Sequence, residues 1–103
     1  MAVKEITDDS FTEETSKGLV VVDFWAEWCG PCKILSPIVE ELSNEMSNVQ
    51  FKKINVDENM EVANSLGITA IPTLVIYKDG HPIDKIIGLL PKVHLKKTIE
   101  KYI

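Results

Sequence analysis

The spacing of hydrophobic residues changes along the chain and divides it into alternating strands and helices. The densest hydrophobic stretch, residues 19–26, is rich in β-branched and aromatic side chains and predicts a strand. Both of its alternating sides are hydrophobic, and only Asp23 interrupts them. This pattern is typical of a central strand that helices cover on both faces.

After Cys32 the hydrophobic residues recur at intervals of three and four, which predicts a long helix with one buried stripe. Pro37 lies inside this helix, removes one backbone donor and should kink it. The stripe consists of Ile34, Leu35, Ile38, Val39, Leu42 and Met46.

The N-terminal half is completed by shorter elements. Residues 3–6 predict a weak first strand, and residues 49–56 predict a third strand. Between the first two strands, Ser10 and Glu13 have the spacing of a capping box, so a short helix should begin there and end at Gly18.

In the C-terminal half, residues 57–66 predict a short helix with Asp57 or Asn59 as its cap and Gly67 as its stop. Asp79-Gly80 then predicts a hairpin turn between strands at 73–77 and 83–87.

A last helix should follow over residues 91–102, with Pro91 in its first turn. Its inward-facing residues would be Leu95, Ile99 and Tyr102. The order βαβαβαββα predicts an α/β fold with a mixed five-stranded sheet and helices on both faces.

Length and charge limit the number of domains and the kinds of partner that the chain can have. The 103 residues fit a single domain, 1–103. The net charge of −5 argues against a nucleic-acid partner. Because the N-terminus has no secretory signal and no stretch is long enough to span a bilayer, we expect a cytoplasmic protein without membrane contact, whose paired cysteines carry metal or redox chemistry.

Cys29 and Cys32 are the only cysteines in the chain. Structural zinc needs four ligands, and His81 and His94 are distant in sequence, so a metal site is not expected. A disulfide that encloses two residues constrains the unfolded chain very little, which disfavours a structural role. Redox chemistry remains as the interpretation.

The pair lies where a buried strand ends and a helix begins. Free backbone N–H groups and the helix dipole should stabilise a thiolate on Cys29, while Cys32 should lie one turn inward and be less exposed. Cys29 would therefore attack and Cys32 would resolve. Gly30 and Pro31 add no charge and no side-chain donor, which favours a reducing pair.

The segment from Asp23 to Lys33, DFWAEWCGPCK, resembles the active-site signature of the thioredoxin family. The resemblance continues at Ile71-Pro72-Thr73, at residues 53–57 and 78–80, and at Gly88. It implies the thioredoxin fold and a general protein-disulfide reductase that an NADPH-dependent thioredoxin reductase recycles. It also implies disulfide-containing substrate proteins, a monomer, and no bound cofactor or metal.

Asp23 should be buried on its strand, with a pKa that desolvation raises toward neutrality. The resemblance implies that Asp23 accepts the proton of Cys32 through water. It places Lys53 beside Asp23, although residues alone would equally allow Lys52 and Lys53 to be two solvated lysines. It also implies a cis peptide bond before Pro72.

The resemblance further implies a shallow hydrophobic docking patch around Cys29, in which the backbone of Ile71 pairs with substrate. The patch would consist of Trp28, Ala70, Ile71, Pro72, Gly88 and Leu89. Ala70 stands where many relatives have Gly, and Pro91 stands where a Ser or Thr cap is common.

Two other functions stay open. An oxidase or isomerase could use the same fold, although Gly30-Pro31 and the missing signal segment oppose it. A redox-independent binding module could dock a partner through Trp28 and the Pro72 loop.

Overall fold

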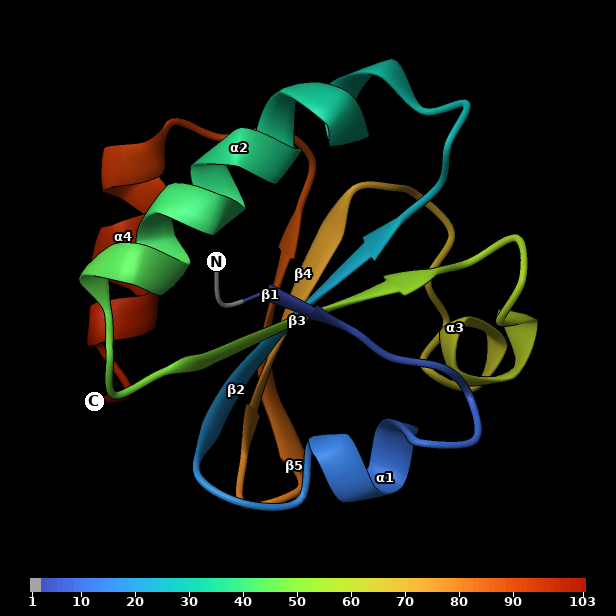
Figure 1. Ribbon diagram of the computed structural model, residues 1–103, viewed down its shortest axis with the longest axis horizontal. Helices are drawn as coiled ribbons and strands as arrows, with labels where there is room; N and C mark the ends of the chain where they lie inside the picture. The colour runs from blue at the N-terminus through green and yellow to red at the C-terminus, as the bar shows by residue number, and fades with distance from the viewer. Residues whose placement is uncertain (1–2) are drawn as a thin grey trace.

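The computed structural model describes residues 3–103, and within them the chain forms five strands and four helices in the predicted order (Figure 1). The elements are β1 (Val3–Glu5), α1 (Phe11–Glu14), β2 (Leu19–Trp25), α2 (Gly30–Glu45), β3 (Gln50–Asn55), α3 (Met60–Ser65), β4 (Thr73–Lys78), β5 (His81–Ile87) and α4 (Lys92–Glu100).

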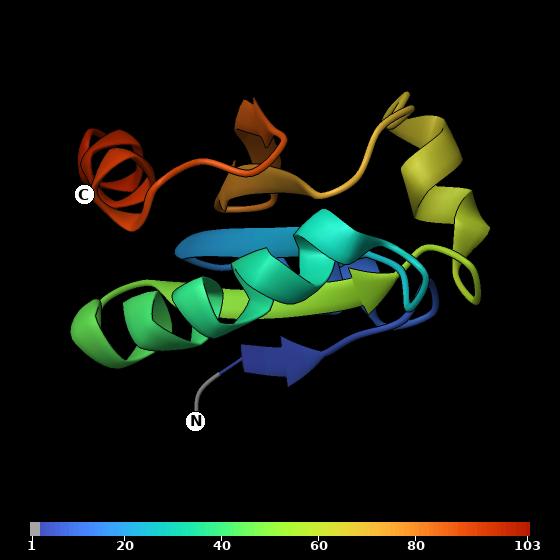
Figure 2. The ribbon, with the colours of Figure 1, turned by 90° about the horizontal axis from the view of Figure 1, so that it is seen from above.

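The strands form one mixed sheet in the order β1-β3-β2-β4-β5. Figure 2 shows the strands stacked in this order, with β1 at one edge and β5 at the other. The central strand β2 is parallel to β3 and antiparallel to β4. The prediction that 19–26 forms a central strand is confirmed, since all of β2 is buried except the half-buried Trp25.

Helices cover both faces of the sheet, as predicted (Figure 1). Helices α2 and α4 pack on the face that receives Leu19 and Val21. Helices α1 and α3 lie on the opposite face, where Val20, Val22 and Phe24 are fully buried. Each face therefore has its own hydrophobic core, and β2 contributes to both.

Helix α1 differs from its prediction at both ends. Ser10 occupies the N-cap position, but its helical backbone (φ −95°, ψ −4°) is not the extended conformation of a capping residue, and no capping box forms. Its hydroxyl instead accepts a hydrogen bond from the Thr7 N–H. The helix ends at Glu14 rather than at Gly18, which takes a positive φ of 73° just before β2.

Helix α3 begins at Met60, later than predicted. Asn59, one of the two predicted caps, occupies the N-cap position, but its side chain makes no capping hydrogen bond. The Asp8 carboxylate caps it instead, because its two oxygens accept hydrogen bonds from the N–H groups of Glu61 and Val62. Gly67 ends the helix with a φ of 68°, as predicted.

Helix α2 buries most of the predicted stripe, and Pro37 lies inside it. Ile34 is an exception: its side chain is 58% exposed, because at about 100° per residue it points away from the side of α2 that carries Leu35 and Leu42. At the other end of the chain, α4 begins after Pro91 and buries Leu95 and Ile99.

The hairpin prediction is confirmed: Asp79 and Gly80 take positive φ values of 49° and 87°, which a tight two-residue turn requires. The hairpin is also tied to the C-terminus. Tyr102, half-buried and just beyond α4, donates a hydrogen bond of 2.6 Å to the Asp84 carboxylate of β5.

Candidate active site

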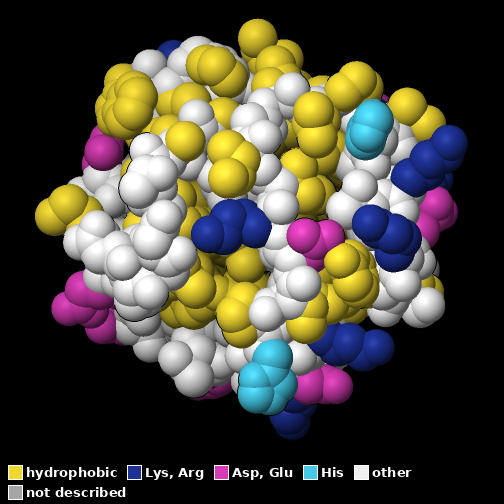
Figure 3. Space-filling model, turned by 180° about the vertical axis from the view of Figure 1, so that it is seen from behind, with side chains coloured by type: hydrophobic (Ala, Val, Ile, Leu, Met, Phe, Trp, Pro, Cys, Tyr) yellow, Lys and Arg dark blue, Asp and Glu magenta, His cyan; other side chains and the backbone are white. Residues whose placement is uncertain are grey.

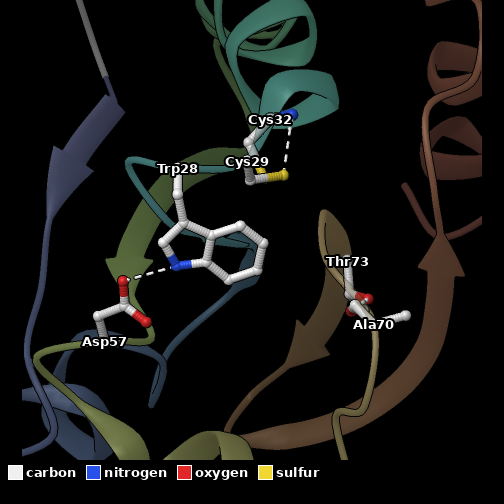
Figure 4. Close-up of a disulfide and its surroundings, with 6 residues drawn as sticks. All are labelled: Trp28, Cys29, Cys32, Asp57, Ala70 and Thr73. Atoms are coloured by element: carbon white, nitrogen blue, oxygen red, sulfur yellow. Dashed lines mark hydrogen bonds between the residues drawn. A yellow bond between two sulfur atoms is a disulfide. The ribbon is translucent and has the colours of Figure 1, made fainter.

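Cys29 and Cys32 are joined by a disulfide at the beginning of α2, with their Cα atoms 5.3 Å apart (Figure 4). Cys29 has an extended backbone at the N-cap position, and its Sγ accepts a hydrogen bond of 3.2 Å from the Cys32 N–H. The predicted place of Cys29 at a helix N-terminus is therefore confirmed, with a backbone donor directed at its sulfur.

Gly30 and Pro31 form the first turn of α2 between the two cysteines, and both are exposed. A Cβ on Gly30 would meet no atom within 4 Å. Packing therefore does not require glycine at this position.

The predicted lower exposure of Cys32 amounts to very little, since Cys29 is 4% exposed and Cys32 is 3% exposed. Both pack with Ala26 against the half-buried Ile71. The two cysteines differ in another way: Cys32 lines a cavity of about 160 Å³ together with Asp23. This shared cavity, rather than exposure, distinguishes Cys32 from Cys29.

Asp23 is buried on β2, as predicted, and its Oδ1 has no hydrogen-bond partner among the described residues. Burial raises the pKa of Asp23 to about 7, against the charge of Lys53, which lowers it. The cavity is large enough for several water molecules. Water could therefore connect the Asp23 carboxyl with Cys32.

Lys53 is the direct cross-strand neighbour of Asp23 on β3, and both side chains line the cavity. Its ammonium lies 3.9 Å from Glu5 Oε1 and 5.6 Å from the centre of the Trp25 ring. The alternative of two solvated lysines is wrong, because Lys52 is buried and pairs with Glu14 at 3.0 Å.

Glu5 was not among the predicted site residues. The signal that could have identified it is the parallel register of β1 and β3, which places Glu5 directly opposite Lys53.

The loop before β4 passes close to the disulfide, and its Ile71–Pro72 peptide bond is cis, as the resemblance implies. The Thr73 hydroxyl donates a hydrogen bond of 2.6 Å to the Ala70 carbonyl across this loop. Gly88 donates its N–H to the Pro72 carbonyl at 2.8 Å and takes a φ of 92°. These contacts bring the loop and the end of β5 together.

Trp28 is 70% exposed beside the disulfide, and its Nε1 donates a hydrogen bond of 2.8 Å to Asp57 (Figure 4). Asp57, expected as a helix cap, instead holds this indole in place. A shallow groove runs beside Trp28 and is also lined by Val56, Ala63, Ile68, Thr69, Ala70 and Ile71.

The other predicted members of the docking patch differ in exposure. Ala70 and Leu89 are exposed, and Ile71 and Gly88 are half-buried. Pro72 is buried, so its side chain does not belong to the surface, and its carbonyl accepts the Gly88 N–H. Hydrophobic side chains gather over much of the face in Figure 3, with single charged side chains between them.

Within residues 3–103, no group of three or more His, Cys, Asp or Glu side chains is arranged to hold a metal ion. In the same part of the chain, no helix is both long enough and apolar enough to cross a membrane.

Comparisons with known proteins agree with this geometry. A family model described as Thioredoxin matches residues 2–101. A protein named Thioredoxin from Listeria monocytogenes is 50% identical over 98% of this chain and 99% of its own length. A second from Bacillus subtilis is 46% identical over the full length of both chains, and a third from Staphylococcus saprophyticus is 42% identical over the same extent.

Proposed function

The chain belongs to the thioredoxin family and has its fold and its thiol–disulfide oxidoreductase chemistry, and on that premise we propose that it is a general protein-disulfide reductase. One observation carries the proposal. The Cys29 sulfur lies at a helix N-terminus and accepts the Cys32 N–H, while Cys32 shares a cavity with a buried carboxyl.

The reaction begins from the dithiol form. The Cys29 thiolate attacks one sulfur of a substrate disulfide, forms a mixed disulfide and releases the first substrate thiolate. The Cys32 thiolate then attacks the Cys29 sulfur, breaks the mixed disulfide and releases the second substrate thiolate. Two electrons pass to the substrate, and the Cys29–Cys32 disulfide forms.

Asp23 is the proton acceptor in the second step. A carboxyl with a pKa of about 7 can take the Cys32 proton near neutral pH and return it afterwards. The cavity between the two groups supports transfer through water. Lys53, the cross-strand neighbour of Asp23, moderates its proton affinity.

Substrates dock around Cys29, on Trp28, Ala70, Ile71, Gly88 and Leu89. The groove beside Trp28 and the exposed hydrophobic side chains support a surface that accepts many protein substrates without strict sequence requirements. The buried Pro72 shapes this surface through its backbone, and the Ile71 backbone is available to pair with an extended substrate segment.

The protein acts as a single-domain monomer in the cytoplasm, and an NADPH-dependent thioredoxin reductase returns it to the dithiol form. It needs no bound cofactor or metal of its own. Gly30 and Pro31 keep the pair reducing, because neither supplies a charge or a side-chain donor that would stabilise the thiolate further.

Trapping tests this function. A Cys32→Ser variant should accumulate mixed disulfides with protein substrates, because the resolving thiol is missing, and nonreducing electrophoresis would detect them. A Cys29→Ser variant is the matched control and should trap none. Equal trapping by both variants would contradict the roles of the two cysteines.

The reduction potential separates the proposed reductase from an oxidase or isomerase on the same fold. We expect a potential near that of thioredoxin, about −270 mV, in equilibrium with glutathione or NADPH. A value near that of the strong oxidant DsbA, about −120 mV, would identify an oxidase instead.

A further inference from the structure

Three ionisable side chains form a row across the sheet, one from each of three neighbouring strands. Asp23 of β2 lies opposite Lys53 of β3, and Lys53 lies opposite Glu5 of β1. Directly opposite residues in neighbouring strands point to the same face of a sheet. The row therefore places two carboxyls on either side of one ammonium, on the face that α2 covers.

We propose that Glu5 is a positioning residue of the thiol exchange: it holds the Lys53 ammonium on the β1 side and so denies Asp23 an ion-pair partner. This inference rests on the proposed function, in which Asp23 accepts a proton. It gives a role to an acidic side chain on the edge strand that never touches either cysteine.

The contacts of Lys53 support this arrangement. Its ammonium pairs with Glu5 at 3.9 Å and lies over the Trp25 ring, and among the described residues it makes no ion pair with Asp23. The Asp23 Oδ1 is buried and has no hydrogen-bond partner in the same part of the chain. The side chain of Lys53 is 32% exposed and lines the cavity that Asp23 and Cys32 share.

The charges of Lys53 and Glu5 have opposite effects on the pKa of Asp23. The Lys53 ammonium lowers the pKa of Asp23, whereas the negative charge of Glu5 raises it. Partial desolvation raises the pKa of Glu5 as well, although its side chain is 46% exposed, and Lys53 opposes this. Since both carboxyls depend on one ammonium, a change at either carboxyl alters the proton affinity of the other.

Few other groups face Asp23. Glu27 and Lys33 line the same cavity, but both are exposed and their charges are opposite. Cys32 of α2 also lines the cavity and is held in the disulfide. On the β4 side, the cross-strand partner of Asp23 is the hydrophobic Leu74. Among the described residues, Glu5 is therefore the acidic group that both pairs with Lys53 and raises the pKa of Asp23 by its charge.

The test compares Glu5→Gln with the parent protein by following the Asp23 side-chain carboxyl in a carbon NMR pH titration. Without the Glu5 charge, Lys53 is free to pair with Asp23, so the Asp23 midpoint should fall by about half a pH unit or more. Glu13→Gln, which removes one exposed charge from α1, should leave the midpoint in place. Glu5→Asp keeps the negative charge, so its Asp23 midpoint should lie closer to the parent value than that of Glu5→Gln.

A double variant separates positioning from a direct field. If Glu5 acts through Lys53, then Glu5→Gln in a Lys53→Met background should move the Asp23 midpoint far less than it does in the parent protein. A shift of the same size in both backgrounds would overturn the positioning role. An unchanged or higher midpoint in Glu5→Gln alone would also overturn it.

The pH dependence of mixed-disulfide resolution distinguishes this inference from the function on which it rests. If the Asp23 midpoint falls in Glu5→Gln and the rate profile follows, both are supported. If the midpoint falls and the rate profile stays, Glu5 still controls the proton affinity of Asp23 through Lys53, but Asp23 is not the proton acceptor and the role of Glu5 in the thiol exchange is overturned.

Discussion

Two adjacent lysines, Lys52 and Lys53, point to opposite faces of the sheet and meet different environments. The Lys52 ammonium is buried and lies 3.0 Å from the Glu14 carboxylate, which also pairs with Lys4 at 2.7 Å. The Lys53 ammonium has Glu5 at 3.9 Å as its nearest acidic partner and leaves the neighbouring Asp23 without one.

The two lysines therefore have different effects on the carboxyl groups near them. On the α1 side, matched charges lower the pKa of Glu14 chiefly through its hydrogen bonds to Lys4 and Lys52, so the group stays ionised at neutral pH. On the α2 side, a buried carboxyl without a close partner has a pKa of about 7 and can exchange its proton. Incomplete pairing thus distinguishes the face on which we propose that Asp23 accepts a proton.

The largest loss in the free energy of unfolding should come from truncating a core residue on the α1 side of the sheet. Phe24 is fully buried there, and its ring lies 6.2 Å from that of Phe11. Phe24→Ala should lower the free energy of unfolding by about 3–5 kcal/mol, measured by denaturant titration. The Asp23 midpoint should stay in place, and a shift of that midpoint would show that the two faces are not independent.

Removal of the buried Asp23 carboxyl on the α2 side should stabilise the protein. The pKa of Asp23 rises from 3.8 in the unfolded chain to about 7 in the folded one. Between these values the native state holds a proton that the unfolded state has lost, so its stability falls as pH rises. Asp23→Asn should therefore be more stable than the parent by about 2–4 kcal/mol at pH 8, and by far less at pH 4. An equal gain at both pH values would contradict the raised pKa.

The same substitution should slow the chemistry. Without a proton acceptor, resolution of a mixed disulfide at neutral pH should be about 100-fold slower in Asp23→Asn, as rapid-quench kinetics would show. Asp9→Asn, which removes one exposed charge from the turn before α1, is the control. An unchanged rate would contradict the role of Asp23.

The smallest effects should come from the two lysines themselves. Lys52→Met leaves Glu14 with one partner and should lower the thermal midpoint by several degrees without altering the pH profile of resolution. Lys53→Met should instead move that profile to higher pH, because the charge that lowers the Asp23 pKa is gone. A shifted pH profile in Lys52→Met and an unchanged profile in Lys53→Met would contradict this assignment of the two lysines.

Much of this fold could be predicted from local patterns, because β2 and α2 have strong and distinct hydrophobic periods. The errors arose where distant segments supply the contacts. Asp8 caps α3 across 53 residues of sequence, and no local spacing could indicate that. Ile34 fits the helical period but lies beyond the surface that α2 buries.

The residues of the site also differ in whether local sequence patterns could predict them. Cys29, Cys32 and Asp23 could be predicted from their positions around one strand and one helix. Glu5 could not, because its relation to Lys53 depends on the register of β1 with β3. The cis bond at Pro72 came from family resemblance alone, and neither the burial of Pro72 nor the Trp28–Asp57 hydrogen bond could be read from the residues.

The Asp8 cap gives α3 a built-in reporter of the N-terminal segment. The amide protons of Glu61 and Val62 are protected by a carboxylate that lies just beyond β1. If β1 detaches, these two amides lose their acceptor, so their hydrogen exchange should accelerate before the rest of α3 opens. Because Glu5 lies on β1, the same two amides can show whether a Glu5 variant has kept its strand in the sheet.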